Sequence, residues 1–296
     1  MKHLRLLPLL LLLSLTARAE SSSLLTLEKI SRTGTISLGH RESSVPFSYY
    51  DNKRQVVGYS HDLMLAVVER IRRELKLPAL AVKLVPVTSQ NRIPLVQNGS
   101  VDLECGSTTH NRDRERQVAF SVSIFQTSSR LLTRRDSGVQ ELADLKGRRV
   151  AVTAGTTSER SLLLYSESTG NRFEIVTVKD HGDGFNRVQE GRAEAFLMDE
   201  AMLYGLRVRA DRPDDWRVVG APMAAEVYAC MLRKDDPRFK ALVDRSLTDL
   251  MVSGEALKIY RRWFQSPIPP KGLNLNWPAP EPLLELYRAP NDRPLG

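Results

Sequence analysis

The run from Leu103 to Ser121 combines hydroxyl and arginine side chains in an order that suits the binding of an anion. Loop hydroxyls and backbone N–H groups can donate hydrogen bonds to an anion, and an arginine fork can pair with a carboxylate through two parallel bonds. The alternative is a threonine that caps a solvated helical turn with alternating charges. The hydroxyl residues are Ser107, Thr108 and Thr109, and the arginines are Arg112, Arg114 and Arg116.

Six further polar residues follow other predicted strands and could complete a ligand site. One arginine can pair with an α-carboxylate, and Asp199 can pair with an α-ammonium, so together they describe an amino acid. The additional cations would then require a second carboxylate, because a neutral ligand would leave buried cations unpaired at a cost of several kcal/mol. The six residues are Arg41, Ser89, Arg92, Thr157, His181 and Asp199.

Each of these residues also has a purely structural interpretation. A single loop arginine is usually solvated, and a loop threonine usually caps a helix. Asp199 could cap a predicted helix over residues 200–206 in the same way. The ligand site is favoured because the residues of this set follow strands that should end at one edge of a sheet.

Alternating strands and helices would bring these residues together. The helix after Ser60, its expected N-cap, places Leu63, Val67 and Ile71 on one face. The alternation predicts an α/β fold with a mainly parallel sheet, and such sheets bind ligands outside the carboxyl ends of their strands. The predicted strands cover residues 35–39, 81–87, 101–105, 148–152, 173–178, 193–197, 218–220 and 227–232.

Motifs of common catalytic and metal sites are missing from the sequence. There is no GxSxG elbow, no phosphate loop ending in GK[ST], and no GxGxxG after the first strand. The five histidines form no HExxH motif or close pair, and the two cysteines lack zinc-site spacing. No two acidic residues stand out as an acid/base pair. We therefore expect a binding protein, not an enzyme, with no cofactor and no metal.

Residues 1–19 have the features of an export signal. A basic start precedes an apolar run over residues 6–15, and residues 17–19 (Ala-Arg-Ala) form a small-x-small cleavage site. The run is too short to span a bilayer, although a retained N-terminal anchor is the alternative. Cleavage would leave 277 residues (296 − 19) with a net charge of +5 (8 − 3). Export and the scattering of basic residues among acidic ones argue against a nucleic-acid partner.

The mature length suggests roughly two domains. The chain also contains two cysteines that lie far apart in the sequence. In an exported chain an even number of cysteines points to a disulfide, here between Cys105 and Cys230, with two buried free thiols as the alternative. Such a bond would return the chain to its first lobe near residue 230. Segments near residues 126–132 and 226–232 would then both cross between two lobes.

Six segments resemble the glutamate/aspartate periplasmic binding proteins of ABC-type amino-acid transporters, a branch of the family 3 solute-binding proteins. The likeness covers nearly the whole mature chain in the same order. It implies a two-lobed type II periplasmic-binding-protein fold with a two-strand hinge that closes on its ligand. The segments are HRESSVPFSYYDN, TSQNRIPLVQNG, ECGSTT, AGTTSE, KDHGDGF and CMLRKDDP, in chain order.

The resemblance also implies roles for individual residues. Arg114 matches the α-carboxylate partner, together with Ser107 and Thr109, and the disulfide of Cys105 with Cys230 fits this branch. The positions that hold the side-chain carboxylate correspond to Arg41, Ser89, Arg92 and His181, while Thr157 lines the site and Asp199 matches the ammonium partner.

The loop before Phe120 departs from the family pattern. Arg112, Asp113 and Glu115 make it more highly charged than the resemblance predicts. The spacing to Phe120 favours Arg114 as the ligand-facing arginine, with Arg116 as its rival.

From this resemblance we expect a monomeric periplasmic protein that captures L-glutamate and L-aspartate and delivers them to membrane ABC permease subunits. Residues 20–127 and 230–296 would form lobe 1, and residues 128–229 would form lobe 2. One alternative is a periplasmic enzyme on the same fold, such as a dehydratase of cyclic acids, which would give Asp199 no ammonium to neutralise. Another is a sensory receptor module, which would need an attached signalling segment.

Overall fold

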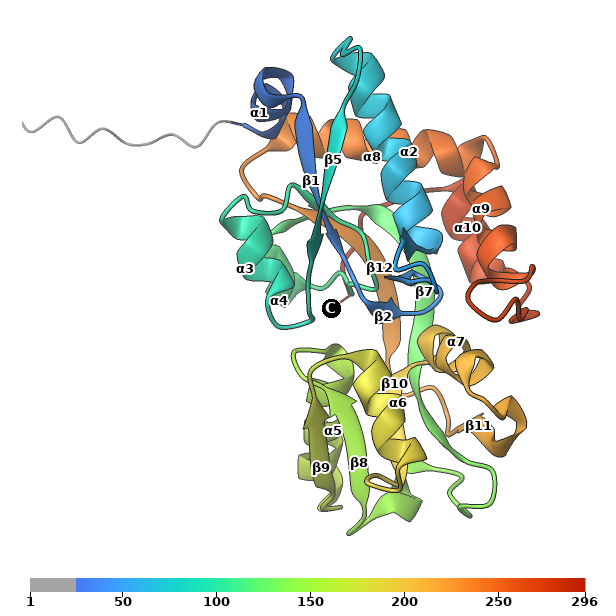
Figure 1. Ribbon diagram of the computed structural model, residues 1–296. Helices are drawn as coiled ribbons and strands as arrows, with labels where there is room; N and C mark the ends of the chain where they lie inside the picture. Colours follow the sequence, from blue (N-terminus) through green and yellow to red (C-terminus); the bar gives the residue numbers. More distant parts are fainter. Residues whose placement is uncertain (1–24, 296) are drawn as a thin grey trace, which may run out of the picture.

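A computed structural model describes residues 25–295, so the expected signal at residues 1–19 lies outside the described part of the chain. Figure 1 shows two α/β units, one above the other, with strands β7 and β12 running between them. Within residues 25–295, no helix combines the length and the apolar character that crossing a bilayer requires.

The upper unit contains one part of a mixed sheet, with the strand order β5-β1-β6-β12-β7. Strand β1 lies parallel to both β5 and β6, whereas β12 runs antiparallel to its neighbours. The parallel strands therefore end at the same edge, as the alternating pattern predicted. The strands are β1 (Thr35–His40), β5 (Ala81–Pro86), β6 (Leu103–Glu104), β7 (Ala119–Arg134) and β12 (Ala225–Leu232).

The lower unit continues the same sheet in the order β7-β10-β8-β9, with β11 also paired to β7. Strands β8, β9 and β10 are mutually parallel, and β7 runs antiparallel to β10. Its own apolar core includes Val150, Leu162 and Leu197, all fully buried. The strands are β8 (Arg149–Thr153), β9 (Glu174–Val178), β10 (Ala195–Asp199) and β11 (Trp216–Val219).

Strand β7 belongs to both units because its two halves have different partners. Its first half pairs with β12, from Leu232 opposite Ala119 to Ala225 opposite Ser128. Its second half pairs with β10, beginning with Asp199 opposite Ser129. The predicted crossing segments thus lie in β7 and β12. The lobe boundaries expected at residues 127/128 and 229/230 fall inside these strands and remain a prediction.

The helices cover both faces of the sheet, and helix α2 shows why they form. Its apolar residues Leu63, Val67 and Ile71 recur with helical spacing and are fully buried, and α2 packs against α8 and α9. The helices are α1 (Thr26–Thr33), α2 (Tyr59–Glu74), α3 (Arg92–Gln97), α4 (Arg112–Glu115), α5 (Thr157–Thr169), α6 (His181–Gln189), α7 (Glu200–Arg209), α8 (Pro237–Val252), α9 (Glu255–Phe264) and α10 (Glu281–Arg288).

The expectation that Ser60 caps helix α2 is wrong. Gly58 is the N-cap, with a φ of 138° that favours glycine. A side chain there would also clash with the backbone of Phe47. The Ser60 hydroxyl instead donates to the carbonyl of Gly106 at 2.8 Å, so it ties α2 to the loop that follows β6.

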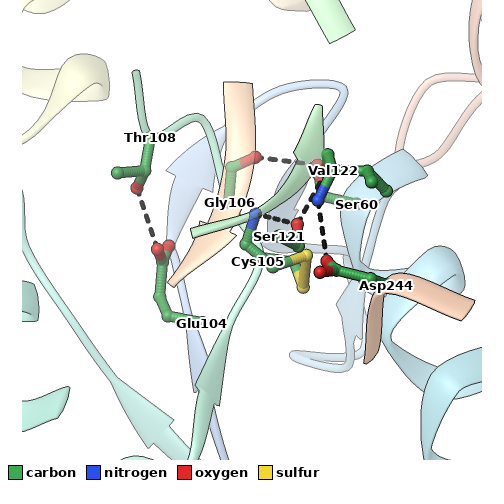
Figure 2. Close-up of a disulfide and its surroundings, with 9 residues drawn as sticks. Ser60, Glu104, Cys105, Gly106, Thr108, Ser121, Val122 and Asp244 are labelled. Atoms are coloured by element: carbon green, nitrogen blue, oxygen red, sulfur yellow. Dashed lines mark hydrogen bonds between the residues drawn. A yellow bond between two sulfur atoms is a disulfide. The ribbon is translucent and has the colours of Figure 1, made fainter. Parts of the chain in front are cut away.

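The predicted disulfide between Cys105 and Cys230 is confirmed. It joins the residue after β6 to β12 across 125 positions of sequence, and Figure 2 shows it beside Gly106 and Ser121. The Ser121 hydroxyl also accepts a hydrogen bond from the Cys230 backbone N–H at 3.0 Å. In the chain-entropy model, closing a loop of this length stabilises the fold by about 5 kcal/mol. The bond therefore holds the loop after β6 against the returning strand.

Candidate ligand-binding site

The structure brings the predicted site residues together between the upper and lower units. Most of them follow strand ends or begin helices, as expected for the carboxyl edge of an α/β sheet. Contacts between the units include Arg41 with His181 and Arg114 with the backbone of Gly155. All nine are buried except Thr157, which is partly exposed: Arg41, Ser89, Arg92, Ser107, Thr109, Arg114, Thr157, His181 and Asp199.

Arg41 follows β1 and is fully buried. Its Nη2 donates to Nε2 of His181 at 3.2 Å and lies 3.8 Å from Asp180. Its Nε and Nη1 groups have no hydrogen-bond partner among residues 25–295. Burial lowers the pKa of the Arg41 guanidinium, and the carboxylates of Asp180 and Glu104 oppose that shift. Buried donors are nearly always satisfied, so this guanidinium is suited to binding acceptor oxygens of a ligand.

His181, the first residue of α6, is a neutral ring in this arrangement. Burial lowers its pKa well below the ordinary value, and the positive charges of Arg41 and Arg92 lower it further. A guanidinium can only donate, so Nε2 is the acceptor from Arg41 and Nδ1 carries the hydrogen. Nδ1 then donates to Oγ1 of Thr153 at 2.9 Å. His181 therefore adds no positive charge to the site and orients Arg41 instead.

A second group of donors surrounds Arg92, at the start of α3. The Arg92 Nη1 donates to Oγ1 of Thr108 at 2.5 Å, and Thr108 donates to the buried carboxylate of Glu104 at 2.8 Å. Within the described part of the chain, the Arg92 Nε and the hydroxyls of Ser89 and Ser107 have no hydrogen-bond partner. Together with Arg41, this end of the site holds several buried donors that can bind acceptor oxygens.

Arg114, and not Arg116, faces the interior. Arg114 is 9% exposed, whereas the Arg116 side chain is 76% exposed. The Arg114 Nη1 donates to the carbonyl of Thr109 at 2.7 Å, and Nη2 donates to that of Gly155 at 3.4 Å. The cap of the short helix α4 is Asn111, which accepts from the Arg114 backbone N–H at 3.0 Å. The threonine cap considered as an alternative is therefore not formed.

Asp199 ends β10 and is buried at the edge where the other site residues gather. It occupies the N-cap position of α7, yet its side chain makes no capping hydrogen bond. Its carboxylate accepts from the hydroxyls of Ser129 at 3.1 Å and Ser158 at 3.3 Å, and also from Tyr228. Burial raises the pKa of Asp199, and these three hydroxyl donors oppose the rise. The capping interpretation is therefore wrong, and Asp199 is suited to pairing with a cation.

Two buried carboxylates near the site were not predicted from the sequence. Glu104, in β6, is fully buried, and Glu226, in β12, is 1% exposed and accepts a hydrogen bond from Thr109. These two acids can pair with cations that were predicted to require a second carboxylate on the ligand. The prediction had left both acids out, so its count of charges was wrong. The predicted strand began at Val227 and left Glu226 out. The sequence contained one signal for Glu226. It lies two residues before Tyr228, so both side chains point to the same face of a segment predicted to cross between the lobes.

Residues 36–266 match the model of the bacterial extracellular solute-binding proteins, family 3. The chain belongs to this family. A glutamate/aspartate import solute-binding protein of Salmonella typhimurium is 52% identical over 270 residues, covering 91% of this chain and 89% of the relative. An L-glutamate/L-aspartate-binding protein of Pseudomonas aeruginosa is 52% identical over 269 residues, covering 90% and 89%.

A solved structure supports the fold independently. An ABC uptake transporter substrate-binding protein of Streptococcus pneumoniae with bound histidine superposes with a TM-score of 0.73 at 20% identity. The match covers 82% of this chain and 98% of that one. The fold is that of the two-lobed type II periplasmic binding proteins, as the resemblance implied.

Proposed function

We propose that this chain is a periplasmic solute-binding protein that captures L-glutamate and L-aspartate and delivers them to an ABC permease for import. The carrying observation is a buried site that combines unpartnered donors with the hydroxyl-bound carboxylate of Asp199. Relatives about half identical over nine-tenths of the chain are named for the same two ligands. Export through the predicted signal and action as a monomer belong to this proposal.

Each end of the site has a proposed role. The ligand α-carboxylate would bind Arg114, whose two backbone bonds leave three of its five N–H donors for other acceptors. Asp199 would hold the α-ammonium. The side-chain carboxylate would accept from the unpartnered donors Arg41, Ser89 and Arg92. Ser107, Thr109, Thr157 and His181 would line the same site.

The binding role also distinguishes this protein from an enzyme. A dehydratase of cyclic acids would need a general acid that faces a substrate without an ammonium group. The three hydroxyl donors on Asp199 stabilise its charged form, which suits pairing with an ammonium better than donating a proton. The proposal is therefore a binding cycle in which ligand bridges two lobes and stabilises their closed arrangement.

Calorimetric titration of refolded protein tests this proposal, since refolding removes any ligand that co-purifies. L-Glutamate and L-aspartate should bind tightly, L-glutamine more weakly, and a plain dicarboxylate such as glutarate weakest. Tight binding of glutamine with none of glutamate would rule out the two-carboxylate ligand. Equal binding of glutarate and glutamate would remove the ammonium role of Asp199.

A further inference from the structure

Glu226 is a buried acid in the candidate site that the proposed ligand contacts do not use. It lies on β12, is 1% exposed, and accepts a hydrogen bond from the Thr109 hydroxyl. Thr109 lies 3.5 Å from Thr157 of the lower unit, measured between their Oγ1 atoms. Glu226 thus reaches the point where the hydroxyls of the two units meet.

With every acid counted as ionised, the fixed charges of the buried site balance before a ligand is added. His181 is neutral, and Asp180 near Arg41 is 21% exposed, more than the other charged groups, so it is left out of the fully buried set. The remaining set contains three cations and three carboxylates, each no more than 9% exposed: Arg41, Arg92, Arg114, Glu104, Asp199 and Glu226.

A dicarboxylic amino acid carries two carboxylates and one ammonium, so it adds one net negative charge to this balanced set. An unpaired charge in a buried site costs several kcal/mol, and a buried acid usually avoids that cost by taking a proton. A zwitterion without a second carboxylate, such as glutamine, adds no net charge. The charge count therefore distinguishes the two ligands.

We infer that Glu226 takes up a proton when a dicarboxylic amino acid binds, so that the occupied site is electrically neutral. This inference rests on the proposed function. Glutamate binding is then linked to pH through a residue that needs no direct contact with the ligand. A protonated Glu226 still has an oxygen that accepts from Thr109, and it gains an O–H donor.

Glu226 is better suited to hold this proton than Asp199, since Asp199 has three hydroxyl donors and faces the proposed ammonium. Burial raises the pKa of Glu226 to about 8, the charge of Asp199 adds to the rise, and hydrogen bonds from Thr109 and Thr157 oppose it. Arg114 also faces Glu226 and lowers its pKa, while Tyr228 lies beside it on the same strand.

Further charged residues line a cleft next to Glu226. A cleft of about 540 Å³ borders Glu226 on this side, and its charged lining residues come from α4, α5 and the turn after α4. Asp113 lies between two of the cleft's arginines and is ion-paired with both. The charged residues of the cleft are Arg112, Asp113, Arg116, Arg160 and Glu226.

The sign of the pH effect follows from the raised pKa. Glu226 has an ordinary pKa of about 4.3 when solvated, so it is ionised in an open protein at neutral pH, whereas burial between the units raises its pKa to about 8 and favours the proton. Binding then takes up protons, and affinity is highest at the acidic end of this window. Between pH 6 and 8, glutamate affinity should fall by up to about tenfold per pH unit as the proton becomes harder to acquire.

Calorimetry in phosphate and in Tris buffers measures this proton uptake directly, because the two buffers differ in ionisation enthalpy. Wild-type protein should take up close to one proton per glutamate at pH 7 and a smaller number with glutamine, which adds no net charge to the site. Glu226→Gln, which mimics the protonated acid, should abolish the uptake and the steep pH dependence, and should bind glutamate more tightly than wild-type protein at pH 7 because it needs no proton. Glu200→Gln, outside the site, should behave as wild type.

Two outcomes would overturn the inference while leaving the proposed function intact. One is tight glutamate binding by wild-type protein without proton uptake. The other is a folded Glu226→Gln variant, checked by its thermal melt, that keeps the wild-type uptake. Failure of wild-type protein to bind glutamate at any pH would overturn both proposals.

Discussion

At the scale of single residues, the arginines should separate the two ends of the ligand. Arg41→Ala and Arg92→Ala should weaken glutamate binding by on the order of a hundredfold and glutamine binding much less, because a buried carboxylate loses its partner. Arg114→Ala should weaken both ligands, since both carry an α-carboxylate. Calorimetry on refolded variants measures these losses, with thermal melts as the test of folding.

Arg116→Ala is the matched control for these arginine variants. Its side chain is 76% exposed, so it should change either affinity by less than about threefold. Equal losses for Arg41, Arg92 and Arg114 with both ligands would show that the two ends have been assigned wrongly.

Site residues that follow strands could be predicted from the sequence. The rule that α/β sheets bind ligands at the carboxyl ends of their strands needs no knowledge of packing. Asp199 and Arg92 were predicted in this way, and the spacing to Phe120 selected Arg114, which is buried, over Arg116, which is exposed. Glu226 could not be found by the rule because it lies inside a strand that returns from the lower unit. Its position depends on how β12 pairs with β7, and no local pattern encodes that long-range pairing.

At the scale of elements, an ion pair joins α4 of the upper unit to α5 of the lower unit. The Arg160 Nη1 lies 2.5 Å from an oxygen of Asp113, which also pairs with Arg116. The unusually charged loop before Phe120 thus contacts the other unit. Because the pair forms only when the units are together, it should favour the closed arrangement.

Asp113→Asn and Arg160→Gln should each weaken ligand binding by no more than about threefold, since exposed ion pairs are weak. The double variant should lose no more affinity than the more affected of the two single variants. High salt should reduce the loss in all three variants. Calorimetry at low and high ionic strength measures this, with Asp136→Asn, an exposed acid within the lower unit, as the control. Strictly additive losses would show that the pair does not act as a unit.

The starts of helices show what local sequence could and could not predict. Helix α6 begins at His181, because Asp180 caps it by accepting from the Gly182 backbone N–H at 3.1 Å. This start points the His181 ring toward Arg41. The glycines in this segment weaken the helical pattern, so the capping aspartate carried the better signal.

At the scale of the whole molecule, the end of the described chain packs against the loop that carries Arg114. The Leu295 backbone N–H donates to the carbonyl of His110 at 3.1 Å, and its carbonyl accepts from Arg112 at 3.3 Å. Nearby, the Asn291 carbonyl accepts from the Ser123 backbone N–H at 2.8 Å. These backbone bonds fix the segment between β6 and β7 from outside the site.

A chain that stops at Pro290 should therefore bind both glutamate and glutamine several-fold more weakly, because the Arg114 loop loses its outer support while every proposed ligand-contacting side chain remains. The control is Asp292→Asn, which removes the 2.9 Å ion pair with Lys240 but keeps the backbone bonds, and should change affinity little. Calorimetry and thermal melts measure binding and folding separately. Unchanged affinity for both ligands would show that β6, the disulfide of Cys105 and helix α4 position Arg114 without the tail.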